Sequence, residues 1–165
     1  MRVRSTASRA RAAAVAAATG TLLVLLSACA LPLDTDRTSD RLDGGELRVG
    51  VTDNPPWVDL SVGEPRGTEV ELLERFAAEA GASVTWREGS EGVLADALHA
   101  GELDVAIGGY TDDTPWTTDA AVSAVYRETT TDGGVTEKHV VLTRMGENRL
   151  LVDLETFLRE NGAGR

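Results

Sequence analysis

The sequence contains a single cysteine, Cys29, and only two histidines, His99 and His139. One cysteine excludes an intramolecular disulfide. The histidines do not stand in an H-x-x-x-H spacing or another arrangement that predicts a metal site. No P-loop is present, and Gly108-Gly109 lacks the third glycine and the following helix of a dinucleotide-binding motif. Because nothing assembles a nucleophile, a base and an oxyanion site, the sequence predicts no enzyme, no cofactor and no metal.

Basic residues are also scarce. The chain has 16 Lys and Arg against 27 Asp and Glu, and four of the basic residues lie within the first 11 positions. Residues 29–165 therefore carry 12 basic and 27 acidic residues, a net charge of −15. Nucleic acids and anionic membranes bind clustered Lys and Arg, so the composition argues against both as partners. In so acidic a chain, neighbouring carboxylates such as Glu69 and Glu71 are expected on the surface.

The first 28 residues have the pattern of a secretory leader. A basic start precedes an apolar run, Ala12–Leu26, that is too short to span a membrane stably. Leu26-Ser27-Ala28-Cys29 resembles the lipobox of bacterial lipoproteins, which implies cleavage before Cys29 and acylation there. The alternative is an ordinary secretory signal with a cysteine near its cleavage site. The lipobox interpretation predicts an extracytoplasmic protein anchored to the cell membrane by a lipid at Cys29.

The segment after the cysteine is polar and rich in turn-forming residues up to Gly45, which predicts a tether. We therefore expect a signal peptide over residues 1–28, a tether over residues 29–45 and a single folded domain over residues 46–162.

Short apolar runs alternate with helical patterns along this domain. Runs with strand character lie at 47–51, 83–87, 103–107, 122–126 and 139–143, and helices are predicted at 68–80, 90–101 and 148–160. Thr68 and Glu71 have the spacing of a capping box, and Gly81 stands where a helix-ending glycine is expected. Residues 128–138 are predicted to be a polar loop. The alternation predicts an α/β domain with a mainly parallel sheet of about five strands flanked by helices.

Polar turns follow the first and third predicted strands, and ligands usually bind at the carboxyl ends of the strands in such a sheet. Trp57 stands in a stiff turn after two prolines, and Trp116 follows Pro115 in the other turn. Two indoles on neighbouring loops can hold a small apolar, aromatic or cationic ligand between them. The alternative for Trp57 is a place in the core. Groups suited to polar contacts with the ligand are Asp53, Asn54, Gly109 and Thr111.

Four motifs over residues 47–126 resemble family 3 of the bacterial extracellular solute-binding proteins, the periplasmic amino-acid-binding components of ABC importers. They are Leu47–Asp53 with Pro56-Trp57, then Gly67–Leu72, Ala97–Asp104 and Gly108–Thr111. The resemblance implies a lobe of the type 2 periplasmic-binding-protein fold. It also implies a small-molecule solute and an ABC permease or other membrane protein as partners.

Two departures from the family pattern change these expectations. After residue 126 the chain goes almost at once to a strand and helix that resemble the family's closing elements. The second lobe is therefore expected to be missing, with the loop Glu128–Lys138 in its place. Trp116 stands where the family has an arginine that binds the ligand's α-carboxylate, and Glu91 stands about where it has an aromatic residue. An indole cannot replace a bidentate Arg–carboxylate pair, so a neutral or cationic solute is expected.

A single lobe offers an open half-site, so weak binding is expected unless a second copy or a membrane protein covers it. The first hypothesis is a lipid-anchored, single-lobed solute-binding protein that serves an ABC-type importer. The second is an accessory or sensory lipoprotein that uses the same face to contact a transporter or receptor and binds no free ligand. The candidate binding residues are Asp53, Asn54, Trp57, Glu91, Gly109, Thr111 and Trp116.

Overall fold

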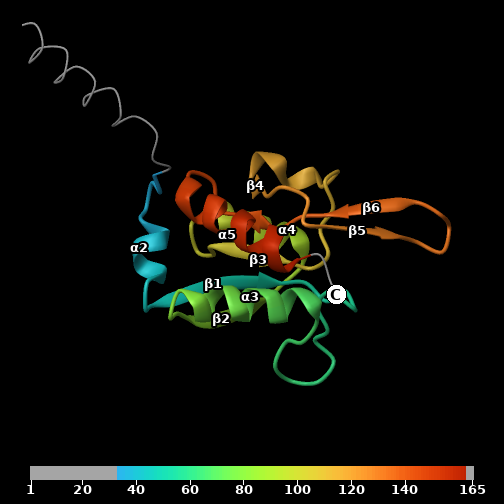
Figure 1. Cartoon of the computed structure of the whole chain (residues 1–165), viewed down its shortest axis with the longest axis horizontal. Helices are drawn as coiled ribbons and strands as arrows, with labels where there is room; N and C mark the ends of the chain where they lie inside the picture. Colours follow the sequence, from blue (N-terminus) through green and yellow to red (C-terminus); the bar gives the residue numbers. More distant parts are fainter. Residues whose placement is uncertain (1–32, 163–165) are drawn as a thin grey trace, which may run out of the picture. The chain divides into compact units, whose positions relative to one another are not determined.

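Five short strands form the central sheet in the order β2-β1-β3-β7-β4 (Figure 1). The computed structural model describes residues 33–162. Strand β1 pairs in parallel with both β2 and β3, and β7 runs antiparallel to β3 and β4. Four of the five strands thus run in the same direction, which confirms the predicted mainly parallel sheet. The strands are β1 (Glu46–Val51), β2 (Ser83–Glu88), β3 (Val105–Ile107), β4 (Ala121–Val122) and β7 (Leu142–Thr143).

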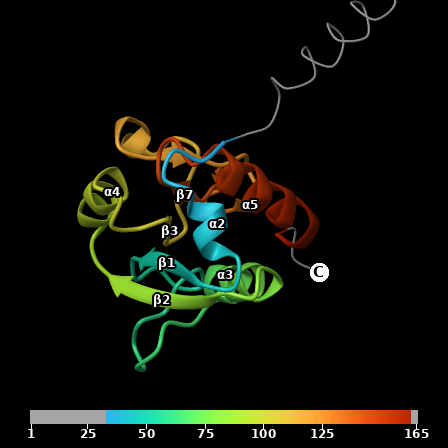
Figure 2. The ribbon, with the colours of Figure 1, turned by 90° about the vertical axis from the view of Figure 1, so that its left-hand side faces the viewer.

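Helices cover both faces of the sheet. Helices α3 (Thr68–Glu79) and α5 (Asn148–Asn161) pack on one face, where their leucines and phenylalanines meet the valines of β1 and β3. Helix α4 (Glu91–His99) and the 3-10 turn η2 (Pro115–Thr118) pack on the other. Figure 2 shows α4 and α5 on opposite sides of β1 and β3. The predicted three-helix arrangement is confirmed.

The ends of α3 explain how one face of the sheet is joined to the turn after β1. Gly81, with φ +68°, ends the helix as predicted, since its N–H and the next one bond back to the last turn. The predicted capping box is wrong, because Thr68 is already the first helical residue. The first-turn N–H groups of Thr68 and Glu69 bond instead to the carbonyls of Pro56 and Trp57. The turn after β1 is thereby fixed to the start of α3.

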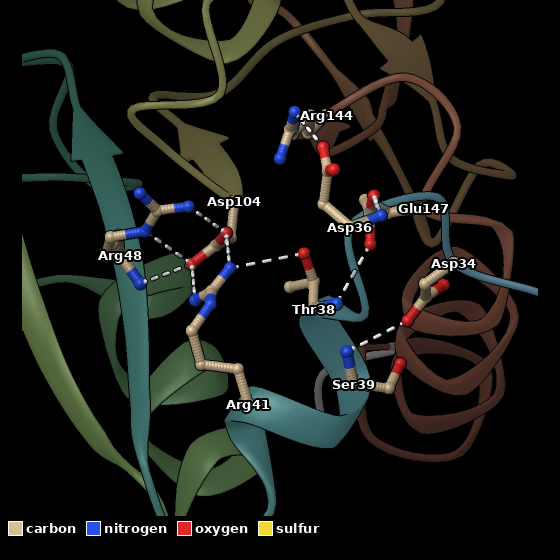
Figure 3. A network of polar contacts seen from close by, with 9 residues as sticks. All are labelled: Asp34, Asp36, Thr38, Ser39, Arg41, Arg48, Asp104, Arg144 and Glu147. Atoms are coloured by element: carbon tan, nitrogen blue, oxygen red, sulfur yellow. Dashed lines mark hydrogen bonds and ion pairs between the residues drawn. The ribbon is translucent and has the colours of Figure 1, made fainter.

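The segment predicted as tether belongs to the folded domain from Asp34 onward. It forms the short helix α2 (Thr38–Leu42) and packs at the amino ends of the strands. Asp34 Oδ1 accepts the first N–H groups of α5, from Arg149 and Leu150. Glu147 in turn accepts N–H groups at the start of α2 (Figure 3). Each segment caps the other's helix, so Asp34 and Glu147 have structural roles. The domain begins earlier than residue 46.

A buried carboxylate holds this segment to the sheet. Asp104, just before β3, has no solvent exposure and pairs with Arg41 of α2 at 2.8 Å and with Arg48 of β1 at 2.7 Å (Figure 3). Burial opposes ionisation, but the hydrogen bonds from Arg48 and Arg41 hold the pKa of Asp104 below its usual value. The cluster lies at the edge of the sheet opposite the turns predicted to bind ligand.

The region after β4 differs from the prediction. The strand expected over residues 122–126 is only Ala121–Val122, and residues 127–139 form a β-hairpin of β5 (Arg127–Thr130) and β6 (Thr136–His139). Figure 1 shows the hairpin extending away from the sheet. The predicted loop Glu128–Lys138 is therefore mostly strand, because threonine-rich runs flank an Asp-Gly-Gly turn and favour a hairpin.

Within residues 33–162, no helix is long and apolar enough to cross a membrane. The predicted signal peptide and Cys29 lie outside the described residues.

Candidate functional site

The turns after β1 and β3 meet at the carboxyl ends of the parallel strands, as predicted. This end of the sheet is called the carboxyl edge below. Asn54 Nδ2 donates to the carbonyl of Gly108 at 2.8 Å. Gly109 has φ +73°, and a Cβ at this position would lie 2.4 Å from Trp57 Cδ1. A side chain at residue 109 would therefore be both strained and in collision with the indole. Three predicted site residues, Asn54, Trp57 and Gly109, are thus in one cluster.

Trp57 is buried beneath these two turns. It is 9% exposed, and its ring packs against that of His139 with centroids 3.9 Å apart and ring planes tilted by 36°. The guanidinium of Arg127 lies 5.7 Å from the same ring. Burial lowers the pKa of His139, whose Nε2 lies 2.7 Å from the hydroxyl of Thr129. The core alternative therefore describes Trp57 better than a ligand sandwich does.

Trp116 of η2 and Glu91, the first residue of α4, form a hydrogen-bonded pair. The indole Nε1 of Trp116, which is half-buried in η2, donates to Glu91 Oε2 at 3.1 Å. Its ring lies against Gly92 at the start of α4, where an added Cβ would come within 3.1 Å of it. The two residues that depart from the family pattern therefore act together: the indole fixes the orientation of an exposed carboxylate.

Glu69 was expected at the surface, and that expectation is wrong. It has no solvent exposure, and its Oε2 accepts the N–H groups of Gly108 at 2.8 Å and Gly109 at 2.9 Å. Its Oε1 accepts the hydroxyl of Tyr126 at 2.5 Å. Burial raises the pKa of Glu69, and these hydrogen bonds oppose the rise. The sequence could have indicated that Glu69 is buried, because residues 69, 72, 73 and 76 share the apolar face of the helix.

Several donors of the two turns are already engaged within the protein. The N–H groups of Gly108 and Gly109, the amide of Asn54 and the indole N–H of Trp116 all donate within the protein. The hydroxyl of Thr111 donates as well, to Asp113 Oδ1 at 2.5 Å.

Carboxylates follow each of the three neighbouring strands β1, β2 and β3. Asp53 Oδ1 accepts the N–H of Leu60 at 2.9 Å, and Glu91 and Asp113 each accept one bond as described above. In residues 33–162, the second carboxylate oxygen of each accepts no hydrogen bond from the protein. Asp113, which sequence reasoning did not single out, belongs with Asp53 and Glu91 as an exposed acid. An edge that presents acceptors suits a cation.

The same described residues contain no group of three or more His, Cys, Asp or Glu side chains placed to hold a metal ion.

The model of the bacterial extracellular solute-binding proteins, family 3, matches residues 47–161. The chain belongs to this family. A search of curated protein sequences gave no match.

Among solved structures, the arginine-bound form of domain 1 from TmArgBP is 26% identical with a TM-score of 0.64. The match covers 73% of this chain and 97% of that one. A truncated arginine-bound ArgBP from T. maritima, 16% identical with a TM-score of 0.63, covers 73% of this chain and 98% of that one and shows the fold alone. The chain matches an isolated domain over nearly that domain's whole length. This confirms the prediction of a single lobe of the family 3 solute-binding fold.

An ancestral cyclohexadienyl dehydratase is also similar, at 26% identity and a TM-score of 0.51. That match covers 56% of this chain and only 39% of the dehydratase chain. The family and the arginine-bound neighbours are binding proteins, although this fold also occurs in an enzyme.

Proposed function

We propose that this protein is an extracytoplasmic solute-binding lobe that binds a small cationic solute at its carboxyl edge. The observation that carries the proposal is that Asp53, Glu91 and Asp113 each present a carboxylate oxygen that accepts no bond from the described residues, while the N–H groups of Gly108 and Gly109 are held by Glu69. Arginine bound by domain 1 from TmArgBP, 26% identical, supports a cation as the ligand. The protein has no catalytic role in this proposal.

The cationic group of the solute contributes most of the affinity, and a carboxylate on the solute contributes little. Trp116 replaces the carboxylate-binding arginine, and the N–H groups of Gly108 and Gly109 already bind Glu69. A guanidinium or ammonium can bridge oxygens from neighbouring strands, and charge-assisted hydrogen bonds are stronger than neutral ones. The indole of Trp116 adds an aromatic surface next to Glu91, which favours a cation further.

Calorimetric titration tests this with three ligands of similar shape. Arginine and agmatine, which lacks the carboxylate, should bind with similar affinity. Citrulline, in which an uncharged urea group replaces the guanidinium, should bind much more weakly. Loss of a hydrogen bond to a charged group costs about 1.5–3 kcal/mol, so Asp53→Asn and Glu91→Gln should each weaken agmatine binding roughly tenfold or more. Glu74→Gln, on an exposed position of α3, is the control.

Binding of arginine but not agmatine would contradict the proposed selectivity. If none of the three ligands binds, the result would favour the accessory-lipoprotein hypothesis. The same acidic edge would then be tested as a contact surface for a membrane protein.

We also propose that the chain is anchored by a lipid on Cys29 and delivers its solute to an ABC-type importer. The lipobox is the observation that supports the anchor, and the family supports the transport role. Leu33, the first described residue, lies four positions after Cys29, and an extended chain spans at most ~3.5 Å per residue. A lipid on Cys29 would therefore keep the domain close to the membrane surface.

A Cys29→Ser variant should move from the membrane fraction to the soluble fraction, because the acylated thiol is replaced by a hydroxyl. Cell fractionation with detection of the protein measures this, and Ser27→Ala, a small residue in the lipobox, serves as the control. A serine variant that stays with the membrane would mean that something other than the lipid retains it.

A further inference from the structure

We infer that Glu69 determines the charge class of the solute, because it holds the N–H groups of Gly108 and Gly109 away from the ligand. The inference rests on the proposed binding of a cation at this edge. Glu69 lies at the start of α3, and its carboxylate reaches across to the loop after β3. It is a positioning residue, since it is fully buried and contacts no solvent.

The loop has the geometry of an anion site that is already filled. Two successive peptide N–H groups point at one oxygen, Oε2, at 2.8 and 2.9 Å, and Gly109 adopts a left-handed φ of +73°. Such pairs of backbone N–H groups form concavities that bind anions. Here the anion is a side chain of the protein itself. A carboxylate on a solute consequently finds neither of these two N–H groups free.

Tyr126 fixes which oxygen faces the loop. Its hydroxyl donates to Oε1 at 2.5 Å, so Oε2 is left for the two glycine N–H groups. Tyr126 is buried and immediately precedes β5. Glu69 therefore joins three parts of the carboxyl edge: the start of α3, the loop after β3 and the base of the hairpin. Loss of the Glu69 carboxylate would leave the two glycine N–H groups without an acceptor and would also detach the loop after β3 from α3.

The decisive variant is Glu69→Ala, which removes a CH2-carboxylate group of the same size as acetate. The amide hydrogens of Gly108 and Gly109 should then exchange with solvent about tenfold faster or more, because a buried acceptor has been lost. Agmatine binding should weaken by a similar factor. Refolding in acetate should restore both slow exchange and agmatine binding. Acetate should also produce a saturable change in the variant and none in the wild type.

Glu71→Ala is the matched control, since this acid lies on the same helix but is exposed. It should leave the exchange of both glycine amides and the agmatine affinity unchanged. Glu69→Gln should keep slow exchange, because its amide oxygen can still accept both N–H groups. Tyr126→Phe should give intermediate exchange, since the carboxylate keeps its place but loses its orienting bond.

Unchanged exchange in Glu69→Ala, or exchange in Glu69→Gln as fast as in Glu69→Ala, would overturn the inference. If the alanine variant does not fold without acetate, comparison of wild type, Glu69→Gln and Tyr126→Phe still decides it. The exchange measurement needs no solute, so it is separate from the proposed function. A wild type that binds no cation refutes the proposed function and leaves the exchange result standing.

Discussion

Replacing Asp104 with asparagine is expected to lower the free energy of unfolding by roughly 2–4 kcal/mol. The carboxylate has no solvent exposure and bonds to both Arg41 and Arg48, as well as to the backbone N–H of Arg48 at 3.0 Å. Asparagine keeps the shape but removes the charge, and its NH2 group faces guanidinium donors. Two arginines whose side chains are 39% and 29% exposed then lose their counter-ion.

The difference in unfolding free energy between wild type and Asp104→Asn should disappear at low pH. The arginine hydrogen bonds keep the folded-state pKa of Asp104 below that of the unfolded chain despite burial. A depressed folded pKa stabilises the protein above the unfolded pKa, about 3.9, and this contribution falls as the pH drops through the folded pKa. Wild type and Asp104→Asn should thus differ most at neutral pH and converge once the pH falls below the folded-state pKa of Asp104.

Urea unfolding at several pH values measures this difference. Glu102→Gln is the control, since Glu102 pairs with Arg87 at the surface, where both side chains are about half exposed. Exposed ion pairs contribute about 0–1 kcal/mol, so that variant should change little. Agmatine affinity should be unaltered in Asp104→Asn, because the cluster lies at the opposite edge from the proposed site. An unfolding free energy no lower than that of Glu102→Gln would contradict the role of the buried cluster.

The elements of the sheet could be predicted because their signals are local. Strand β1 is a short apolar run, and α3 places apolar residues on one face and ends at Gly81. Burial of such patterns leaves few alternatives, so the order of strands and helices follows from the sequence. The hairpin was missed because its strands carry charged and polar residues on both faces, and only the Asp-Gly-Gly turn and the threonines indicated it.

The candidate site was only partly predictable, because its chemistry depends on which hydrogen bonds form. The sequence indicates that Asp53, Asn54 and Gly109 lie at one edge, and the structure brings the two turns that carry them together. It does not indicate that Glu69 uses the donors of the next loop, since that bond joins residues 39 and 40 positions apart. Because Glu69 accepts both N–H groups, they are not free for an anion, which agrees with the neutral or cationic solute that the sequence predicts.

The tether prediction failed for a related reason. A polar segment is typical of a solvated linker, but carboxylates also cap helices, and composition does not distinguish the two roles. Asp34 caps α5, and Arg41 reaches Asp104, each across more than 60 positions of the sequence. Partners so distant in the chain cannot be identified from the segment's own residues.

A chain that begins at Glu46, where the sequence places the start of the folded domain, is therefore expected to be far less stable than one that begins at Leu33. Its Glu147, 1% exposed, loses the N–H groups of Asp36 and Thr38, and Asp104 loses one arginine. The Asp34 cap of α5 and the buried side chain of Leu42 are lost as well. Each loss costs about 1–3 kcal/mol, and a domain of this size has only about 5–15 kcal/mol in total. The shorter chain should be largely unfolded near physiological temperature.

Thermal unfolding followed by circular dichroism compares the two chains, and a synthetic peptide of residues 33–45 provides the control. If helix α2 contributes through its contacts, the peptide added in excess should raise the melting temperature of the shorter chain, because it binds the folded state alone. A peptide with Asp34→Ala and Arg41→Ala should not, since it lacks the cap for α5 and the partner of Asp104. Equal melting temperatures for the two chains would instead return residues 34–45 to the role of tether.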